Sequence, residues 1–270
     1  MITPEPDQFA PPAGTLAAAG RRMLLLCRNL GRAVRMGVEA FLLLRFAFSR
    51  RNRREVLVQL FVTGIKSLGI ITVVGLFIGM VLTLQTGLEL RRFGREINTG
   101  AAVTLVIVRE MGPFMTGLII AASVGSAITA QIGTMVISEE VSALEVMSIN
   151  PARFLVMPRL AALLLMMPLL TVYTNIMSVV GGAIVGQRQL GISVPAYIDS
   201  VQWFITNKDV YVGLLKAVIY GAIIATTACH QGFSAREGAV GVGMATRRTV
   251  IISFLLVLVV GYIVSRLFYE

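Results

Sequence analysis

Long apolar runs alternate with short charged stretches along this chain. Counted without the charged flanks, each run falls in or above the range of about 17–25 residues with which a helix crosses a bilayer. The runs are 67–88, about 99–138 with Arg109 and Glu110 inside it, 160–187, about 210–233 with Lys216 inside it, and 249–265. We therefore expect an all-α integral membrane protein with five transmembrane helices.

A different pattern precedes the first run, over residues 17–48. At 100° per residue, charged side chains gather on one side of a helix and apolar ones lie towards the other. The charged set is Arg21, Arg28, Arg32, Arg35 and Glu39, and the apolar set is Met23, Leu26, Leu30, Val34, Phe41 and Leu44. Such a helix tends to lie in the membrane interface. The alternative is a short helix packed on the protein.

These patterns divide the chain into three parts. Residues 1–16 contain four prolines and two acidic residues, and we expect a disordered N-terminal tail. Residues 17–54 hold the interfacial amphipathic helix and a basic linker. Residues 55–270 form the transmembrane domain.

Composition supports the membrane class. The chain is 56% hydrophobic and 14% charged, with a mean hydropathy of +0.81, whereas soluble domains are about 45–50% apolar and 25% charged. The 24 Lys and Arg residues against 14 Asp and Glu residues could suggest nucleic acid. Basic residues flanking membrane spans are instead a topology signal, so we predict no nucleic-acid binding.

The distribution of basic residues predicts the orientation. With five spans, the connecting segments alternate between the two sides of the membrane. Segments 1–66, 139–159 and 234–248 hold 16 Lys and Arg residues, and segments 89–98, 188–209 and 266–270 hold 6. Cytoplasmic segments carry the excess of basic residues, which predicts a cytoplasmic N-terminus and an outward-facing C-terminus.

An acidic stretch connects the second and third runs, and it reads SEEVSALEVMSINP. Two helix starts are possible within it. Ser142 and Glu145 have the spacing of a capping box, and Ser138 followed by Glu139 and Glu140 is a rival start, because carboxylates are favourable at a helix N-terminus. Either start predicts a short helix on the cytoplasmic face.

This short helix is predicted to be amphipathic. Val141, Leu144 and Met147 recur at intervals of three and form one apolar edge beside the carboxylates. The edge could pack on the membrane base of the same protein, or it could dock into a groove on a soluble partner.

Small residues recur at every fourth position in the first two spans. They are Gly75, Gly79, Thr83 and Gly87, then Gly117, Ala121, Gly125, Thr129 and Gly133, with Ala122, Ser126, Ala130 and Thr134 adjacent. Such stripes let helix backbones approach closely in lipid. The spacing fits intrachain packing, a homodimer, or both.

Two charged residues within the predicted spans are candidate functional residues. A charge at a helix centre costs about 2.5–3.5 kcal/mol on insertion scales, so we expect Glu110 to face a polar cavity or a partner such as Lys216. Lys216 could face the same cavity, or it could extend to the outer surface near Asp209.

Motifs for catalysis and metal binding are missing from the sequence. It contains no GxxxxGK[ST] loop, no HExxH and no GxSxG. Cys27 and Cys229 are far apart, and His230 stands alone, so we predict no metal site and two buried thiols. Energy for work against a gradient would come from ions or another subunit.

Four strings carry a resemblance to a known family. REMGPFMTGLIIAASVGSAITAQIGTM, EEVSALEVMSINP and PRLAALLLMMPLL follow one another, and GVGMATRRTVIISF precedes the last span. From about residue 55 to its end, the chain resembles the MlaE/YrbE permeases, the membrane subunits of ABC systems that move lipid with MCE proteins. The resemblance implies an interfacial helix, five spans and a coupling helix between spans two and three.

The resemblance also implies site residues. The coupling helix would contact the cytoplasmic ATPase through Glu139, Glu140, Leu144, Glu145 and Met147. The lipid cavity would be lined by Leu82, Gln85, Leu90, Phe93, Arg109, Glu110 and Lys216.

The implied assembly is a homodimer in the bacterial inner membrane, with the C-terminus periplasmic. Two ATPase subunits would bind below it, holding the ATP and magnesium, so that this chain needs no cofactor. A hexameric ring of periplasmic MCE subunits would sit above, and a cytoplasmic STAS-type accessory subunit could join the ATPase. The cargo would be phospholipid, moved between the inner membrane and the MCE protein for outer-membrane lipid homeostasis.

Two other classes of function stay open on the residues alone. A stand-alone ion-coupled carrier would use Glu110 and Lys216 as a relay and would leave the acidic helix unexplained. A membrane scaffold would have no use for the charges within its spans.

Overall fold

The structure is a computed structural model that describes residues 31, 35–42 and 53–270. Within these residues all regular secondary structure is helical, and five helices are long and apolar enough to cross a membrane. They span Arg53–Arg92, Glu96–Ile137, Ala152–Gln189, Asn207–Phe233 and Gly238–Tyr269. The prediction of an all-α protein with five spans is confirmed. Each helix extends beyond its uncharged run, because charged residues continue the helix at its ends.

Four of the spans are single or nearly single α-helices, and one is divided. The first, fourth and fifth spans are α2 (Arg53–Arg92), α9 (Asn207–Phe233) and α10 (Gly238–Tyr269). The third is α7 (Met157–Gln189), which follows a π-helical turn at Ala152–Val156. The second comprises α3 (Thr99–Val106), α4 (Gly112–Ile120) and α5 (Ser126–Ile137), joined by π-helical segments at Ile107–Met111 and Ala121–Gly125.

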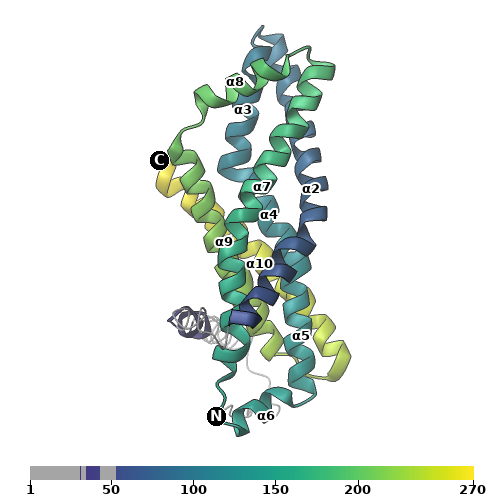
Figure 1. The fold of residues 1–270 in the computed structure, drawn as a ribbon, viewed down its shortest axis with the longest axis vertical. Helices are drawn as coiled ribbons and strands as arrows, with labels where there is room; N and C mark the ends of the chain where they lie inside the picture. Colours follow the sequence, from purple (N-terminus) through teal and green to yellow (C-terminus); the bar gives the residue numbers. More distant parts are fainter. Residues whose placement is uncertain (1–30, 32–34, 43–52) are drawn as a thin grey trace, which may run out of the picture.

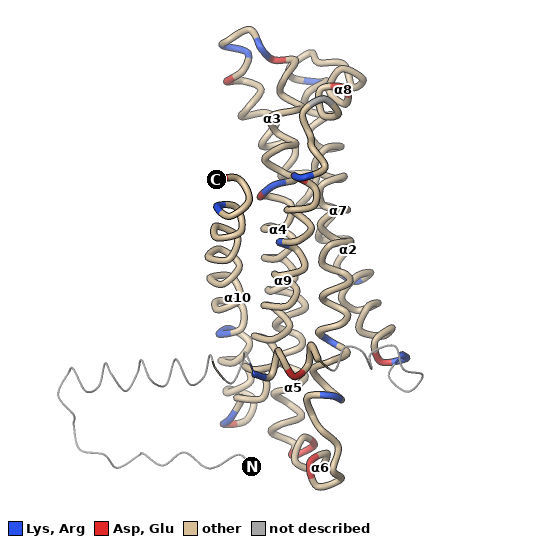
Figure 2. The backbone as a smooth tube through the Cα atoms, turned by 90° about the vertical axis from the view of Figure 1, so that its left-hand side faces the viewer, with Lys and Arg blue, Asp and Glu red and all other residues tan. Residues whose placement is uncertain are grey.

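Short helices close the two ends of the bundle. At one end lies α6 (Glu140–Val146), and at the other lies α8 (Val194–Phe204), together with a 3₁₀ turn at Glu96–Asn98. We refer to these as the α6 end and the α8 end. In Figure 1, α2, α3 and α7 rise above the C-terminus towards the α8 end, whereas α9 and α10 stop at its level. Charged residues gather near both ends and around that level, separated by long uncharged stretches (Figure 2).

Helices α2 and α7 lie side by side with almost no space between their backbones. A Cβ atom added to Gly79 would lie 1.8 Å from the carbonyl oxygen of Ser178, and one added to Gly181 would lie 2.2 Å from that of Leu76. The Ser178 hydroxyl donates to the carbonyl of Gly75 at 3.0 Å. The small-residue stripe of the first span therefore serves packing within the chain.

The first stripe of the second span is also used within the chain. Gly117 faces Tyr220 of α9, and Gly125 faces Ile224 of the same helix. The hydroxyls of Thr129 and Thr249 lie 2.8 Å apart, which joins α5 to α10. The adjacent stripe differs, because its Ala122 and Thr134 are exposed and its Ser126 and Ala130 are half-buried. That second stripe stays a predicted surface for a second copy.

Helix α8 is held against α2 by a buried phenol. Tyr197 has no exposed surface, and its hydroxyl lies 3.1 Å from that of Thr83. Burial raises the pKa of Tyr197, so the phenol stays neutral. The small residue Gly182 makes room for this ring, whose hydroxyl would lie 2.4 Å from a Cβ atom there.

Only part of the predicted amphipathic helix 17–48 lies within the described residues. Residues 35–42 are helical, with Ala40 buried and Met36 packed on the main hydrophobic core. The amide of Asn150 donates to Glu39 at 3.0 Å, whereas Phe41 and Leu42 are 61% and 67% exposed. This part of the helix thus packs on the protein along one face and presents apolar side chains on another. Cys27 and the N-terminal tail lie outside the described residues, and Cys229 is buried as predicted.

The predicted capping box at Ser142 and Glu145 is wrong. Helix α6 starts at Glu140, so Ser142 lies inside it. Helix α5 ends at Ile137, and the chain reverses direction within two residues, which places Glu139 in the left-handed region at φ 60°. The rival start lies nearer to the observed one, because α6 begins at Glu140, but the N-cap is Glu139 and no side chain caps the helix. The Ser138 hydroxyl donates instead to the Glu140 carboxylate at 2.9 Å.

Replacing Gly79 by alanine should lower the thermal stability of the detergent-solubilised protein. The added methyl group would collide with the backbone of α7 and force the two helices apart. Gly69→Ala is the matched control, because Gly69 lies in the same helix with open space around it. Alanine there should be neutral or stabilising by up to about 1 kcal/mol. Thermal unfolding followed by intrinsic fluorescence measures both, and equal midpoints would contradict the close packing.

Candidate functional site

Four charged side chains meet near the level where α9 and α10 end. Arg109 and Glu110 come from the π-helical segment of the second span, and Asp209 and Lys216 come from α9. Arg109 Nε lies 2.6 Å from Asp209 Oδ1, and Lys216 Nζ lies 2.6 Å from Glu110 Oε1. We call these four residues the polar site. Two positive and two negative charges make it neutral overall.

The ammonium group of Lys216 is the buried centre of the polar site. Its side chain has no exposed surface. It donates to Glu110 Oε1 at 2.6 Å, to Ser265 Oγ at 2.6 Å and to the carbonyl oxygen of Arg109 at 2.9 Å. The hydroxyl of Ser265 also donates to the Glu110 carboxylate. All three ammonium protons therefore have acceptors, as a buried charge requires.

The predicted pairing of Glu110 with Lys216 is confirmed, and the alternative in which Lys216 extends to the surface is wrong. The reason is geometric. Lys216 lies seven residues into the chain from Asp209, about 10 Å deeper along the helix, and acceptors are within reach on the facing helices. A lysine that can satisfy every proton locally gains nothing by extending to the interface.

Asp209 organises the outer layer of the polar site. Its Oδ2 accepts from the backbone N–H and the hydroxyl of Thr206, at 3.0 and 2.7 Å, which forms a capping box at the start of α9. Its Oδ1 accepts from Arg109 and, at 3.1 Å, from the hydroxyl of Tyr269. The Arg109 guanidinium lies 4.4 Å from the centre of the Tyr269 ring. One carboxylate thus starts α9 and ties it to the second span and to the last residues of α10.

A proline explains why a backbone oxygen is available to Lys216. In a regular α-helix the carbonyl of Arg109 would accept from the N–H of residue 113. Residue 113 is Pro113, which has no N–H. The π-helical segment at Ile107–Met111 lies directly before this proline, and π-bulges are frequent at functional sites. The freed carbonyl becomes the third acceptor for the ammonium group.

Exposure divides the polar site into a buried half and an open half. The side chains of Lys216 and Asp209 are 0% and 1% exposed, whereas those of Glu110 and Arg109 are 42% and 35% exposed. The open half presents a carboxylate next to a guanidinium. Such a surface can bind a ligand that itself carries both charges, and the half-exposed Glu110 carboxylate beside the buried Lys216 ammonium group also has the composition of a proton relay.

The four predicted cavity residues of the first span lie on α2 and in the turn directly after it. Leu82 and Leu90 are half-buried, Gln85 is exposed and Phe93 is 76% exposed, beyond the end of the helix. Among the described residues, no hydrogen bond or ion pair joins them to the four charges. Because α2 and the second span run antiparallel, Phe93 lies near the start of the latter, at Glu96, whereas Glu110 lies about 20 Å further along it. Their assignment to one lipid cavity stays a prediction.

Three residues that form or contact the polar site were not predicted from the sequence. They are Asp209, Ser265 and Tyr269. Asp209 was noted only as a marker of the outer surface. Thr206 and Asp209 have the capping-box spacing, a signal that could have fixed the start of α9. Nothing in the sequence indicates that the last helix would bring Ser265 and Tyr269 to the second span.

The second candidate site is the exposed surface of α6. Glu139, Glu140 and Glu145 are exposed at the α6 end of the molecule. The predicted apolar edge is divided, since Val141 is buried, Leu144 is half-buried and Met147 is 61% exposed. Val146 is 86% exposed beside it. Part of the edge therefore packs on the protein, and the tip presents two apolar side chains among carboxylates.

Comparison with known proteins finds extensive similarity. A family model described as Permease MlaE matches residues 56–267. A probable ABC transporter permease protein of Rickettsia prowazekii is 38% identical over 212 residues, which are 78% of this chain and 82% of the relative. The intermembrane phospholipid transport system permease protein MlaE of Haemophilus influenzae is 33% identical over 262 residues, 94% of this chain and 97% of the relative.

A plant relative extends the comparison. The chloroplast protein TRIGALACTOSYLDIACYLGLYCEROL 1 of Arabidopsis thaliana is 31% identical over 227 residues, 84% of this chain and 65% of the relative. The region matched by the family model contains the polar site and α6.

The ion pair between Lys216 and Glu110 predicts that the effects of substituting the two residues on stability are not additive. Lys216→Met alone should lower the stability by about 1–3 kcal/mol, because it leaves the Glu110 carboxylate, which is 42% exposed, without its partner. Adding Glu110→Gln removes that charge, so the double variant should be more stable than Lys216→Met alone. Thermal unfolding in detergent measures the cycle, with Lys66→Met as the control because Lys66 is exposed on α2. Additive losses would refute the coupling.

Proposed function

The chain belongs to the MlaE permease family, and on that premise we propose that it is the non-catalytic transmembrane subunit of an ATP-driven phospholipid transporter. The observation that best supports this proposal is the similarity over nearly the whole chain to a permease of an intermembrane phospholipid transport system. Five spans, no catalytic motif and an acidic helix exposed at one end are what such a subunit requires.

The proposed place of the chain is the bacterial inner membrane, with the α6 end cytoplasmic and the α8 end periplasmic. The excess of Lys and Arg in the segments on the α6 side supports this orientation. A soluble ATPase would then meet α6, and a periplasmic MCE protein would meet the α8 end. A STAS-type subunit would join on the ATPase side.

The α6 surface supports the contact with the ATPase. Val146 and Met147 offer apolar anchors, and Glu139, Glu140 and Glu145 surround them with negative charge. A matching partner has an apolar groove with a basic rim. ATP binding and hydrolysis would stay in that partner, together with its magnesium.

The polar site supports a role in handling the lipid. Two copies facing each other would enclose a cavity into which Arg109 and Glu110 present their open side. A phospholipid carries a negative phosphate and, in zwitterionic lipids, an ammonium group, so a guanidinium beside a carboxylate can contact both. Leu82, Gln85 and Leu90 of α2, with Phe93 directly after it, would line the apolar part of this cavity.

The direct experiment is affinity purification of the chain from its native membrane in mild detergent, with mass spectrometry of the co-purifying proteins. We expect an ATPase and an MCE protein in near-stoichiometric amounts. Recovery of the chain alone from several detergents would count against the proposal and in favour of an ion-coupled carrier that uses Glu110 and Lys216.

Charge reversal on α6 should detach the ATPase. Glu140→Lys and Glu145→Lys place a positive charge where a basic rim would bind, and the repulsion should reduce the ATPase recovered per permease severalfold. The matched control is Asp199→Lys, which reverses an exposed acid on α8 at the opposite end. Equal losses from all three variants would argue against docking at α6. The readout is quantitative mass spectrometry of the pull-down.

Neutralising Glu110 should impair lipid transfer when equal amounts of folded protein are compared, because Glu110→Gln also leaves the buried Lys216 ammonium group without its counter-charge and lowers stability. Glu110→Gln keeps the size of the side chain but weakens its bond to Lys216 and removes the open carboxylate. The assay is ATP-dependent transfer of fluorescent phospholipid from proteoliposomes containing the purified complex. Glu89→Gln, an exposed acid at the end of α2, is the control. Undiminished transfer by Glu110→Gln would support the scaffold alternative.

A further inference from the structure

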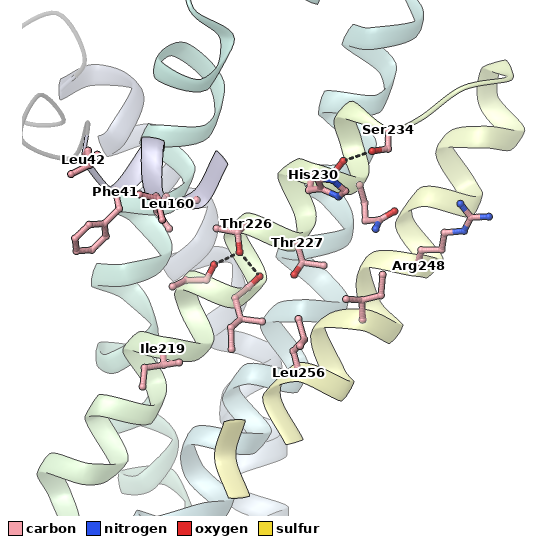
Figure 3. A pocket seen from close by; sticks show the side chains of 16 residues that line it. Phe41, Leu42, Leu160, Ile219, Thr226, Thr227, His230, Ser234, Arg248 and Leu256 are labelled. Atoms are coloured by element: carbon pink, nitrogen blue, oxygen red, sulfur yellow. Dashed lines mark hydrogen bonds between the residues drawn. The ribbon is translucent and has the colours of Figure 1, made fainter. Parts of the chain in front are cut away.

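A second cavity, distinct from the polar site, lies between four helical segments and extends towards the α6 end. It has a volume of about 670 Å³, is partly open, and is lined by residues of helix 35–42, α9 and α10, with Leu160 of α7. Figure 3 shows these side chains from close by. The cavity shares none of its lining residues with the polar site or with α6.

The lining is apolar along most of its length. Ile219 and Ile223 of α9, Ile252 and Leu256 of α10, and Phe41 of the short helix form this part. Two threonines, Thr226 and Thr227, lie in the middle, and the Thr226 hydroxyl is satisfied within its own helix, because it donates to the carbonyls of Ala222 and Ile223, at 2.8 and 3.1 Å. An occupant of this part must be apolar.

The opposite end of the cavity is polar and basic. His230, Gln231 and Ser234 from the last turns of α9 lie there with Arg248 of α10. In Figure 3 the guanidinium of Arg248 lies on the same side of the cavity as His230 and Ser234, away from Ile219 and Leu256. Arg248 is exposed, so its charge can meet an anion from solvent or from the membrane surface.

The length of the cavity matches one leaflet of a bilayer. Along α9 the lining extends from Ile219 to Ser234, a rise of about 22 Å. Half of a bilayer, headgroups included, measures about 20–22 Å. The polar end coincides with the end of the α9 span, where headgroups lie, and the apolar end reaches towards the middle of the membrane.

We propose that this cavity binds an anionic phospholipid of the leaflet on the α6 side, with the phosphate at Arg248 and an acyl chain along Ile219, Ile223 and Leu256. Three observations favour a lipid: the segregation of apolar and basic residues, the length of one leaflet, and the apolar side chains at the edge. Val38, Phe41 and Leu42 are 54%, 61% and 67% exposed there. The basic end selects a negative headgroup.

A lipid in this position would hold helix 35–42 against α9 and α10. That helix packs through Ala40 and through Gly37, where an added Cβ atom would lie 2.7 Å from the Thr226 methyl group. The cavity fills the remaining space beside it. The inference concerns only the membrane-embedded chain and does not rest on the proposed transport function.

The test is photo-crosslinking of the full chain in lipid nanodiscs, with whatever subunits accompany it. The probe is phosphatidylglycerol carrying a diazirine on one acyl chain, compared with the matching phosphatidylcholine. We expect labelling within 219–223 and 252–256, with phosphatidylglycerol preferred by about fivefold, the effect expected of one basic residue near an anionic surface. Peptide mass spectrometry locates the label.

Two neighbouring arginines provide a matched pair of variants. Arg248→Gln should abolish the preference for phosphatidylglycerol, whereas Arg247→Gln should preserve it, because Arg247 is exposed on the same helix but does not line the cavity. Both residues are on the surface, so both variants should fold. Ala222→Phe should fill the apolar part and reduce labelling with either lipid.

Three results would overturn the proposal. They are equal labelling by the two lipids, equal behaviour of the two arginine variants, and no label at the lining residues. A second copy of the chain in the cavity would exclude the lipid probe and give the third of these results. Loss of ATPase binding or of lipid transfer has no bearing on these readouts, so the two proposals fail separately.

Discussion

The arrangement of the α8-side half of the bundle depends on one fully buried ammonium group. Lys216 has no exposed surface, and a buried charge that loses a partner destabilises a protein strongly. Its acceptors come from two other spans, namely the carboxylate and a backbone carbonyl of the second span and Ser265 of α10. The three helices can therefore take only one register relative to each other at this level. Asp209 then fixes the next layer outward, because it caps α9 and binds Arg109 and Tyr269 together.

Elsewhere the bundle is held by close packing, because the hydrophobic effect does not drive helices together within lipid. Gly79 and Gly181 let the backbones of α2 and α7 touch, and the buried hydroxyls of Thr129 and Thr249 join α5 to α10. Such contacts require small residues in register along whole helices, which is why the stripes are visible in the sequence. The stripes mark close packing, but only the three-dimensional arrangement shows which of them face a neighbour in the same chain.

Sequence patterns predicted the number of spans and the Glu110–Lys216 pair, since both depend on local rules, hydropathy and the cost of a charge in lipid. They did not predict what tertiary structure decides. Asp209 lies at a helix start, so its sequence context indicates only a cap, and its bonds to Arg109 and Tyr269 arise from helices about 100 and 60 residues away along the chain. Likewise, the sharp reversal after Ile137 puts Glu139 at positive φ and moves the start of α6 away from Ser142. A proline such as Pro113 indicates from the sequence that the helix is weakened there. That the Arg109 carbonyl accepts from Lys216 depends on the position of the facing helix, which the sequence does not give.

The second span joins the polar site to the α6 end of the molecule. The second span runs from the polar site at Glu110 to Ile137, about 40 Å along its axis, and α6 follows after two residues. A π-helical segment at Ala121–Gly125 interrupts it midway, beside the Gly125 contact with α9. Below that segment, Thr129 ties the helix to α9 and α10 through the Ala228 carbonyl and Thr249. A partner that pushes on α6 therefore acts on a helix anchored to its neighbours on both sides of an irregular turn. The turn is the place where such a helix can bend without breaking the buried bonds of Lys216 at one end or of Thr129 at the other.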